Sequence, residues 1–442
     1  MSLTTKDKIT IFWHRRDLRL HDNTGLYYAL KSGNPVVPLF IFDRNILDDL
    51  DNKKDSRVSF IHEAVTGMRE ELKKAGADIL VEYGFPTEIW KSLSEKYQIA
   101  EVITNTDYEP YATERDQEIY RILKKEGIPF KAYKDHVIFE KKEVLSLQNT
   151  PYTVFTPYSR AWREKCNDFY LSSYPTRKYF KNLHKWKGPS IPSLKEMGFE
   201  KTDQTFPSSK VETELLENYG EQRNFPGIKG TSHLGIHLRF GTVSIREMAR
   251  KGNENSSTWL NELIWRDFYH QILWHFPHVG KGKAFRAAYD TIKWRNNQGE
   301  FKKWCEGKTG YPLVDAGMRE LNETGFMHNR VRMVTASFLA KHLLIDWRWG
   351  EAYFAEKLLD YDLAANNGGW QWAAGSGTDA APYFRIFNPT AQAEKFDPQG
   401  VYIKKWVPEI GTDQYPEPIV DHKIARERCL LVYKEALNQD EK

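Results

Sequence analysis

The first 130 residues alternate between short apolar runs and charged segments with helical spacing, and this alternation constrains the fold more than any other feature. Segments 58–75 and 114–127 carry apolar residues at helical intervals. The apolar runs lie at residues 9–13, 36–42, 79–83 and 101–104. Short buried strands that alternate with helices are typical of a parallel sheet. We therefore expect a Rossmann-like α/β domain with ligands at the carboxyl ends of its strands.

The remainder of the chain has a different pattern. Residues 150–210 contain repeated prolines and many Ser, Thr and Lys residues, which indicates a long ordered connector. From residue 211 onward the apolar residues follow helical spacing, most regularly over 259–276 and 329–344. We expect an α/β domain, an interdomain connector and an all-α domain, over residues 1–130, 131–210 and 211–442.

Composition excludes several classes of protein. Of the 442 residues 40% are hydrophobic and 14% are aromatic, so general disorder is excluded. The longest clean apolar run, 36–42, is too short to cross a bilayer, and residues 1–8 are polar, unlike a secretory signal. The 3 cysteines form no CxxC pair, which favours a reducing environment. We expect a cytoplasmic protein that contacts no membrane.

Three motifs with known chemistry are incomplete. The stretch 307–309 (GKT) lacks the upstream glycine and the preceding strand of a phosphate-binding loop. The stretch 375–380 fits a loose dinucleotide pattern but follows no strand, which favours a turn. Three histidines lack a carboxylate at metal-ligand spacing: His270, His275 and His278. The sequence therefore predicts no metal site.

Two helical stretches gather unusual side chains on one face. Glu262 and Trp265 share a face, and a carboxylate beside a large ring can hydrogen-bond and stack one flat group. The alternative is an amphipathic helix with Glu262 in solvent. The second stretch combines an amide, a guanidinium and a thioether, in Asn329, Arg332 and Met333. A plain surface face is the alternative there.

Two further stretches suit a bulky or phosphorylated ligand. In the segment 360–372, Asn366 and Trp370 share a helical face, whereas Trp372 points elsewhere. The pair at 368–369 (GG) costs a helix about 1 kcal/mol per glycine, which indicates close approach by something bulky. Residues 230–235 place hydroxyls and backbone N–H groups at a helix start, a natural phosphate cradle, although Ser and Thr also cap ordinary helices.

Together these stretches resemble the photolyase/cryptochrome family, and within it the class I cyclobutane pyrimidine dimer photolyases. The resemblance extends from the motif at 13–23 (WHRRDLRLHDN) to about Pro389 and is most specific over 259–389. It implies an antenna-type α/β domain and an all-helical domain that holds FAD. It also implies a reaction, in which photoexcited reduced FAD gives an electron to a pyrimidine dimer flipped out of DNA.

The resemblance assigns roles to individual residues. FAD would contact Tyr219, Thr231, Ser232, Leu234, Glu262, Asn329, Arg332, Asp360, Asp362 and Asn366. The dimer and the DNA would contact Arg223, Glu262, Trp265, Asn329, Arg330, Met333 and Trp372. Electrons would reach the flavin from the surface through Trp294, Trp347 and Trp370. Glu262 would hydrogen-bond the dimer, and Asn366 would face the flavin N5.

Two departures from the family pattern concern the cofactors. Gly235 and Ile236 replace the common Ser-Pro of the phosphate cradle, so one hydroxyl contact is lost. Tyr111 and Ala112 stand where folate-binding relatives carry Asn-Glu, which argues against methenyltetrahydrofolate in its usual pose. A second, antenna chromophore is therefore of unknown identity: a deazaflavin, a second flavin and an empty cleft stay open.

Two alternatives to DNA repair are a cryptochrome-type blue-light receptor and a flavoprotein without photochemistry. The set Trp265, Asn329, Met333 and Trp372 matches the dimer-photolyase pocket, and the chain stops at Lys442 without a long signalling tail. Both features favour repair. We expect a monomer whose partner is DNA that contains pyrimidine dimers; the net charge of +4 permits this where the cations cluster.

Overall fold

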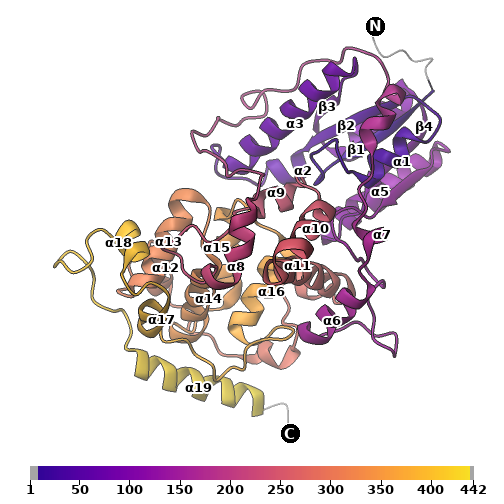
Figure 1. Cartoon of the computed structure of the whole chain (residues 1–442). Helices are drawn as coiled ribbons and strands as arrows, with labels where there is room; N and C mark the ends of the chain where they lie inside the picture. The colour runs from indigo at the N-terminus through magenta and orange to yellow at the C-terminus, as the bar shows by residue number, and fades with distance from the viewer. Residues whose placement is uncertain (1–7, 439–442) are drawn as a thin grey trace. The chain divides into compact units, whose positions relative to one another are not determined.

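The computed structural model describes residues 8–438, and its N-terminal part is a parallel five-stranded sheet with the order β3-β2-β1-β4-β5 (Figure 1). The strands are β1 (Lys8–His14), β2 (Val36–Asp43), β3 (Leu80–Gly84), β4 (Gln98–Asn105) and β5 (Phe130–Tyr133). The four strands predicted from apolar runs are confirmed. β5 escaped prediction because this edge strand has exposed side chains at Lys131 and Ala132 and no apolar run. The polar N-terminal stretch lies outside the described residues, apart from Lys8.

Helices connect the strands. They are α1 (Thr24–Leu30), α2 (Arg44–Leu47), α3 (Ser56–Lys74), α4 (Pro86–Lys96) and α5 (Pro110–Lys125). Both predicted helices, 58–75 and 114–127, are present but begin earlier. The Asp55 side chain caps α3 by accepting the Arg57 N–H at 2.8 Å, and Pro110 opens α5.

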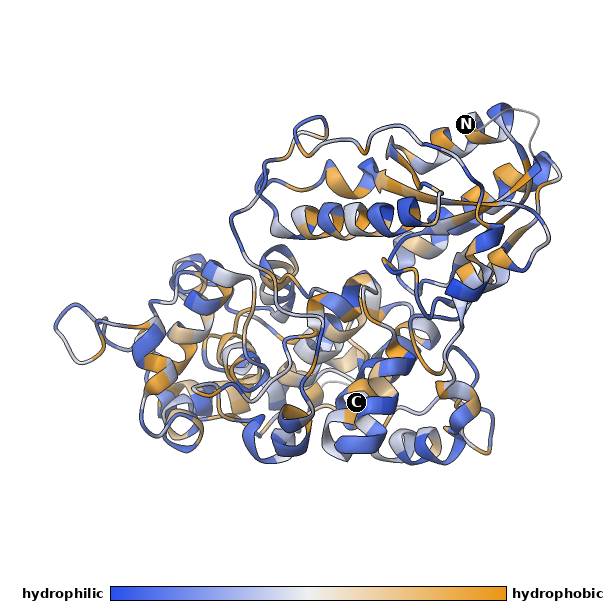
Figure 2. Cartoon of the chain, turned by 45° about the horizontal axis from the view of Figure 1, so that its top comes forward, coloured by the Kyte–Doolittle hydropathy of each residue, from blue (hydrophilic) through white to orange (hydrophobic). Residues whose placement is uncertain are grey.

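Apolar side chains cover the sheet on both faces. Every residue of β2 is buried, and so is every residue of β1 after Lys8. The strands carry much of the hydrophobic colour of this part in Figure 2. A parallel strand buried on both faces has a continuous apolar sequence rather than an alternating one. This is why the strands could be predicted.

The described chain forms two compact units that interleave along the sequence. The first contains residues up to 140, 166–210 and 234–251; the second contains 141–165, 211–233 and the residues from 252 onward. Five short helices lie in these crossing segments: α6 (Phe155–Lys165), α7 (Asp168–Leu171), the 3-10 helix η1 (Thr176–Asn182), α9 (Gly235–Phe240) and α10 (Ile245–Asn255). The division by function at residues 130 and 210 stays a prediction.

The second unit is helical, as predicted for residues from 211 onward. Its main helices are α8 (Thr213–Gln222), α11 (Ser257–His275), α12 (Gln298–Cys305), α13 (Pro312–Thr324), α14 (Asn329–Ser337), α15 (Trp347–Lys357), α16 (Leu363–Ala374), α17 (Pro389–Phe396), α18 (Val401–Trp406) and α19 (His422–Asn438). The short 3-10 helices are η2 (Val279–Lys281) and η3 (Ala287–Thr291). None of the helices in residues 8–438 is long and apolar enough to cross a membrane.

The helix predicted over 329–344 changes its geometry part-way. α14 ends at Ser337, and a π-helical turn, η4 (Phe338–His342), follows it. The Leu343 N–H donates to the Phe338 carbonyl five residues earlier, at 3.1 Å. Apolar spacing predicts a helix but cannot separate an i to i+4 ladder from an i to i+5 ladder.

Tryptophans form much of the core of the second unit. Trp304, Trp347 and Trp370 are buried in one apolar cluster built from α12 to α16. All three therefore have a structural role in the core. The role in electron transfer that the resemblance assigns to Trp347 and Trp370 stays a prediction.

Candidate functional site

A polar cleft lies at the carboxyl ends of β1, β4 and β5, where the order of the strands reverses. Open α/β sheets bind ligands at this position. Eight residues line it: Arg15, Arg16, Asp17, Asn105, Thr106, Asp107, Asp135 and His136. The cleft lies at the edge of the sheet where the sequence predicts ligands, at the carboxyl ends of the strands.

The arginines of this loop are paired within the unit. Arg15 forms an ion pair with Asp116, and Arg16 contacts Asp107 at 3.2 Å and Glu109 at 2.7 Å. Burial works against ionisation of Asp107, but the guanidinium groups of Arg16 and Arg15 outweigh it and lower the pKa of Asp107. Arg15 and Arg16 are therefore engaged with carboxylates of the segment 107–116.

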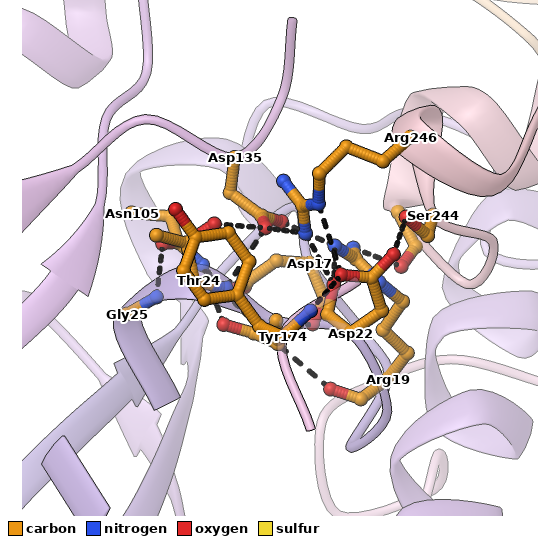
Figure 3. Close-up of polar contacts among 12 residues, drawn as sticks. Asp17, Arg19, Asp22, Thr24, Gly25, Asn105, Asp135, Tyr174, Ser244 and Arg246 are labelled. Atoms are coloured by element: carbon orange, nitrogen blue, oxygen red, sulfur yellow. Dashed lines mark hydrogen bonds and ion pairs between the residues drawn. The ribbon is translucent and has the colours of Figure 1, made fainter. Parts of the chain in front are cut away.

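The same motif continues into a buried charge network (Figure 3). Arg246 contacts Asp22 at 2.9 Å and Asp135 at 2.8 Å, and Arg19 contacts Asp135 at 2.5 Å. The Ser244 hydroxyl also donates to Asp22, at 2.5 Å. All of these side chains are buried. The network fixes the segment 234–251 to the sheet, so this part of the motif builds the fold.

Helix α16 is the centre of the candidate site in the second unit. The Asp362 side chain caps it by accepting the Ala365 N–H at 3.2 Å, and α16 packs against α11, α14 and α15. A Cβ on Gly368 would lie 2.2 Å from the Tyr269 ring, so the predicted close approach is confirmed there. Nothing lies within 4 Å of a Cβ on Gly369, so that position is open.

A half-buried ion pair lies beside α16. Arg332 on α14 contacts Asp360 at 2.9 Å, and its Nε donates to the Met327 carbonyl at 2.7 Å. The Asn366 Nδ2 donates to the Glu351 main-chain carbonyl at 3.2 Å. An acid, a guanidinium and an oriented amide can together hydrogen-bond the polar edge of a heterocycle.

Glu262 on α11 faces a cation from another helix. Its carboxylate forms an ion pair with Arg223, which lies 5.6 Å from the centre of the Tyr219 ring. Burial works against the charge on Arg223, but Glu262 outweighs it and raises the pKa of Arg223. Glu262 is therefore ion-paired, although its side chain is still 31% exposed. Desolvation lowers the pKa of Arg330, and the positive charge of Arg223 lowers it further.

Two tryptophans assigned to the substrate have aromatic neighbours. Trp265 stacks on Phe155 at 3.6 Å with an interplanar angle of 4°, and Trp372 lies 6.4 Å from Phe387. Both tryptophans are half-buried. On α14, Met333 is half-buried and Asn329 is exposed at the first helical position.

Of the three tryptophans assigned to electron transfer, two are buried and one is half-buried. Trp370 is 2% exposed and Trp347 is 1% exposed, whereas Trp294 is half-buried. The Trp370 ring covers Gly350, one helical turn from Trp347 on α15. Trp294 lies 6.1 Å from Tyr433, edge to face.

The loop before α9 offers unused donors. Among residues 8–438, the hydroxyls of Thr231 and Ser232 have no hydrogen-bond partner, and both residues are half-buried. A Cβ on Gly230 would meet Gln222 at 2.8 Å, so only glycine fits there. Leu234 is buried, belongs to the first unit and precedes α9. Free hydroxyls in a tight turn suit a phosphate.

Sequence reasoning missed three residues of this region. Phe155 supports Trp265 from a segment 110 positions earlier, and no local pattern connects the two. Glu351 and Asn367 form a hydrogen bond at 2.9 Å behind Asn366. The adjacent asparagines at 366–367 were the one available signal, because paired amides inside a helix are unusual.

Comparison with known proteins supports the assignment to a family. Residues 10–178 match the family of DNA photolyase, and residues 259–412 match the FAD binding domain of DNA photolyase. The chain is 36% identical over 470 residues to the deoxyribodipyrimidine photo-lyase of Synechococcus sp., with 96% of each chain covered. The chain belongs to the photolyase/cryptochrome family.

Solved structures of photolyases and a cryptochrome have the same fold. A class III photolyase from Agrobacterium tumefaciens matches with a TM-score of 0.86 and 32% identity, covering 99% of both chains. A photolyase from Sulfolobus tokodaii with two FAD molecules gives 0.79 and 34%, covering 96% of this chain and 99% of the other. A Synechocystis cryptochrome gives 0.80 and 26%, covering 98% of this chain and 100% of the other.

The photolyase FAD domain fits the chemistry of the residues present. The free hydroxyls of Thr231 and Ser232 suit the FAD phosphates, and the Arg332–Asp360 pair with Asn366 suits its ring edge. FAD is therefore the cofactor of the helical unit. The contacts of individual residues with FAD stay predictions.

Proposed function

We propose that this chain repairs cyclobutane pyrimidine dimers in DNA with blue light, as a deoxyribodipyrimidine photo-lyase. The observation that carries the proposal is the arrangement of Glu262 and Trp265 on one face of α11, which packs against α16 with Trp372. A full-length relative named deoxyribodipyrimidine photo-lyase supports it.

FAD, when bound, supplies light absorption and one-electron chemistry. The protein positions the substrate. A dimer cannot be reached inside a duplex, so it must be flipped out before reaction. Trp265 stacks on Phe155 and lies 5.5 Å from Tyr269, and its half-buried ring is the candidate stacking surface for a base.

Glu262 and Arg223 would orient the dimer at the mouth of the pocket. A carboxylate accepts hydrogen bonds from pyrimidine N–H groups, and its ion pair with Arg223 fixes its position before substrate arrives. Arg330 donates to Asn224 at 2.8 Å and keeps further N–H groups for a DNA phosphate. The protein thus holds substrate with a preorganised carboxylate and cations.

Trp370, Trp347 and Trp294 would carry electrons inward from the surface. Trp370 and Trp347 are buried and Trp294 is half-buried, which supports Trp294 as the outermost of the three. In the first unit, the cleft lined by Arg15 and Arg16 is the candidate site for a second chromophore. A planar antenna with acidic groups would have to compete with the carboxylates that already pair with both arginines.

A blue-light receptor without repair is the second candidate, favoured by the likeness to a cryptochrome. Binding to lesions separates the two functions, because a light receptor does not need to bind DNA with a dimer more tightly than undamaged DNA. We expect wild-type protein to bind an oligonucleotide with a thymine dimer more tightly than the undamaged one, and to restore the bases in light.

Trp265→Ala and Trp372→Ala test the pocket directly. Stacking on an aromatic ring is worth about 1–3 kcal/mol per base, so each variant should bind the dimer roughly 5- to 150-fold more weakly. Binding to undamaged DNA should change little, because phosphate contacts dominate it. Tyr120→Ala, an exposed aromatic in the first unit, is the control. Equal affinity of the wild type for both DNAs would rule out the repair function.

A further inference from the structure

Glu351 is a carboxyl group that the proposed reaction leaves without a role. It lies on α15, one residue after Gly350, where the Trp370 ring covers the helix. Its side chain is half-buried and accepts the Asn367 Nδ2 at 2.9 Å. Asn367 is its single hydrogen-bond partner among residues 8–438, and the carboxyl makes no ion pair within that range.

The cation that acts on Glu351, Arg348, is already paired. Arg348, three residues earlier on α15, contacts Asp346 at 3.1 Å and also forms an ion pair with Asp290. Asp346 adds a like charge to the surroundings of Glu351. Desolvation therefore raises the pKa of the Glu351 carboxyl to about 7, and Asn367 and Arg348 oppose it only in part.

Glu351 contacts both asparagines at the start of α16. Its main-chain carbonyl accepts the Asn366 Nδ2 at 3.2 Å, while its carboxyl accepts from Asn367. A carbonyl oxygen can only accept, so the nitrogen of the Asn366 amide must face α15 and its oxygen must face away. Among residues 8–438 that oxygen accepts no hydrogen bond.

Asn367 is fixed from three sides. Its Nδ2 also donates to the Val279 carbonyl at 3.1 Å, and its Oδ1 accepts the Gln371 Nε2 at 3.0 Å. Gln371 in turn accepts the Phe285 N–H at 2.7 Å. Only the Glu351 end of this chain of hydrogen bonds can change its charge.

We propose that Glu351 is a positioning residue for Asn366: it ties α15 to α16 so that the Asn366 amide oxygen is presented to the flavin. This rests on the proposed function and on the family resemblance, which implies that Asn366 faces the flavin N5. A neutral carboxyl keeps negative charge away from the edge that gains an electron, whereas an ionised one opposes electron uptake.

Glu351→Gln and Glu351→Ala separate the effect of the carboxylate charge from the effect of the hydrogen bond to Asn367. Glutamine can accept the same hydrogen bond from Asn367 but cannot ionise. Alanine can neither accept this hydrogen bond nor ionise. In wild type, photoreduction of oxidised FAD should slow as the pH rises through about 7. Glu351→Gln should stay at the low-pH rate throughout, and Glu351→Ala should be slower at every pH. Glu356→Gln, on the exposed side of α15, should follow wild type.

A dark measurement tests the same idea without photochemistry or DNA. The infrared difference between about pH 6 and about pH 8.5 should show loss of a protonated carboxyl in wild type and Glu356→Gln but not in Glu351→Gln. The proposal would be overturned if Glu351→Gln had the same pH profile or the same infrared difference as wild type. Failure of wild type to repair dimers, with these signals intact, would instead contradict the proposed function alone.

Discussion

Trp370 shows how one residue can serve both the core and electron transfer. Its ring is 2% exposed, lies 5.0 Å from Phe354 and 6.1 Å from Trp304, and covers Gly350. Burial keeps the indole at a fixed position, which an electron-hopping site requires. The same burial means that a substitution must preserve volume, because a cavity here would destabilise the unit.

Trp370→Phe should block photoreduction of oxidised flavin but spare repair by chemically reduced enzyme. Phenylalanine keeps an apolar ring in the core, yet it is far harder to oxidise than tryptophan. The measurement is the absorbance of oxidised flavin under blue light, beside dimer repair after dithionite reduction. Normal photoreduction in the variant would mean that a different residue supplies the electron.

At the scale of elements, the contact between η4 and α19 depends on neutral histidines. His342 Nε2 and His422 Nδ1 lie 2.8 Å apart, so one ring donates and the other accepts. Burial lowers the pKa of His342 to about 3, and His422, Arg428 and Lys341 add to the effect. A pKa below the unfolded value of about 6.5 means that the unfolded chain binds more protons below that pH.

We therefore expect stability to be complete above about pH 6.5 and to fall as the pH decreases toward 3. Between about pH 7 and about pH 5 the loss from His342 should be roughly 2 kcal/mol. Urea unfolding at the two pH values measures it. His342→Gln should flatten this dependence, and the exposed His278→Gln should not. Equal slopes for all three proteins would show that this contact does not titrate.

At the scale of the whole molecule, charge clustering matters more than the net charge of +4. Exposed Lys281 and Lys283 border η2 in the second unit, while Arg223 is engaged with Glu262. Basic side chains on phosphates release counterions, which makes binding weaken as salt increases. Free lysines, rather than the paired Arg223, should therefore dominate the salt dependence.

Lys281→Ala with Lys283→Ala should reduce the slope of log affinity against log salt by about 2, since each phosphate contact contributes roughly 0.9. Titration of undamaged duplex DNA between roughly 50 and 200 mM salt gives the slope. Lys124→Ala with Lys125→Ala, an exposed pair on α5, is the matched control. The assignment would be contradicted by an unchanged slope in the first double variant.

The sequence predicted those features that leave a local signal. Four strands and the helix at Trp259 were visible because burial imposes apolar patterns over neighbouring residues. The short edge strand β5 and the π-turn at 338–342 were not, because neither changes the spacing of apolar residues. The family resemblance supplied the roles of the site residues. Contacts such as Phe155 with Trp265 depend on tertiary packing and leave no local pattern.

The buried network of Figure 3 has a consequence for how the chain is made. Asp22 finds its cation in Arg246, which lies 224 positions later. At 5–20 residues per second, a ribosome needs roughly 10 to 45 s to synthesise that stretch. During this time the sheet strands have all emerged, but the Asp22 carboxylate has no cation to accompany it into the interior. The α/β unit therefore completes its folding only after residues 141–165 and 211–233 of the second unit have been synthesised.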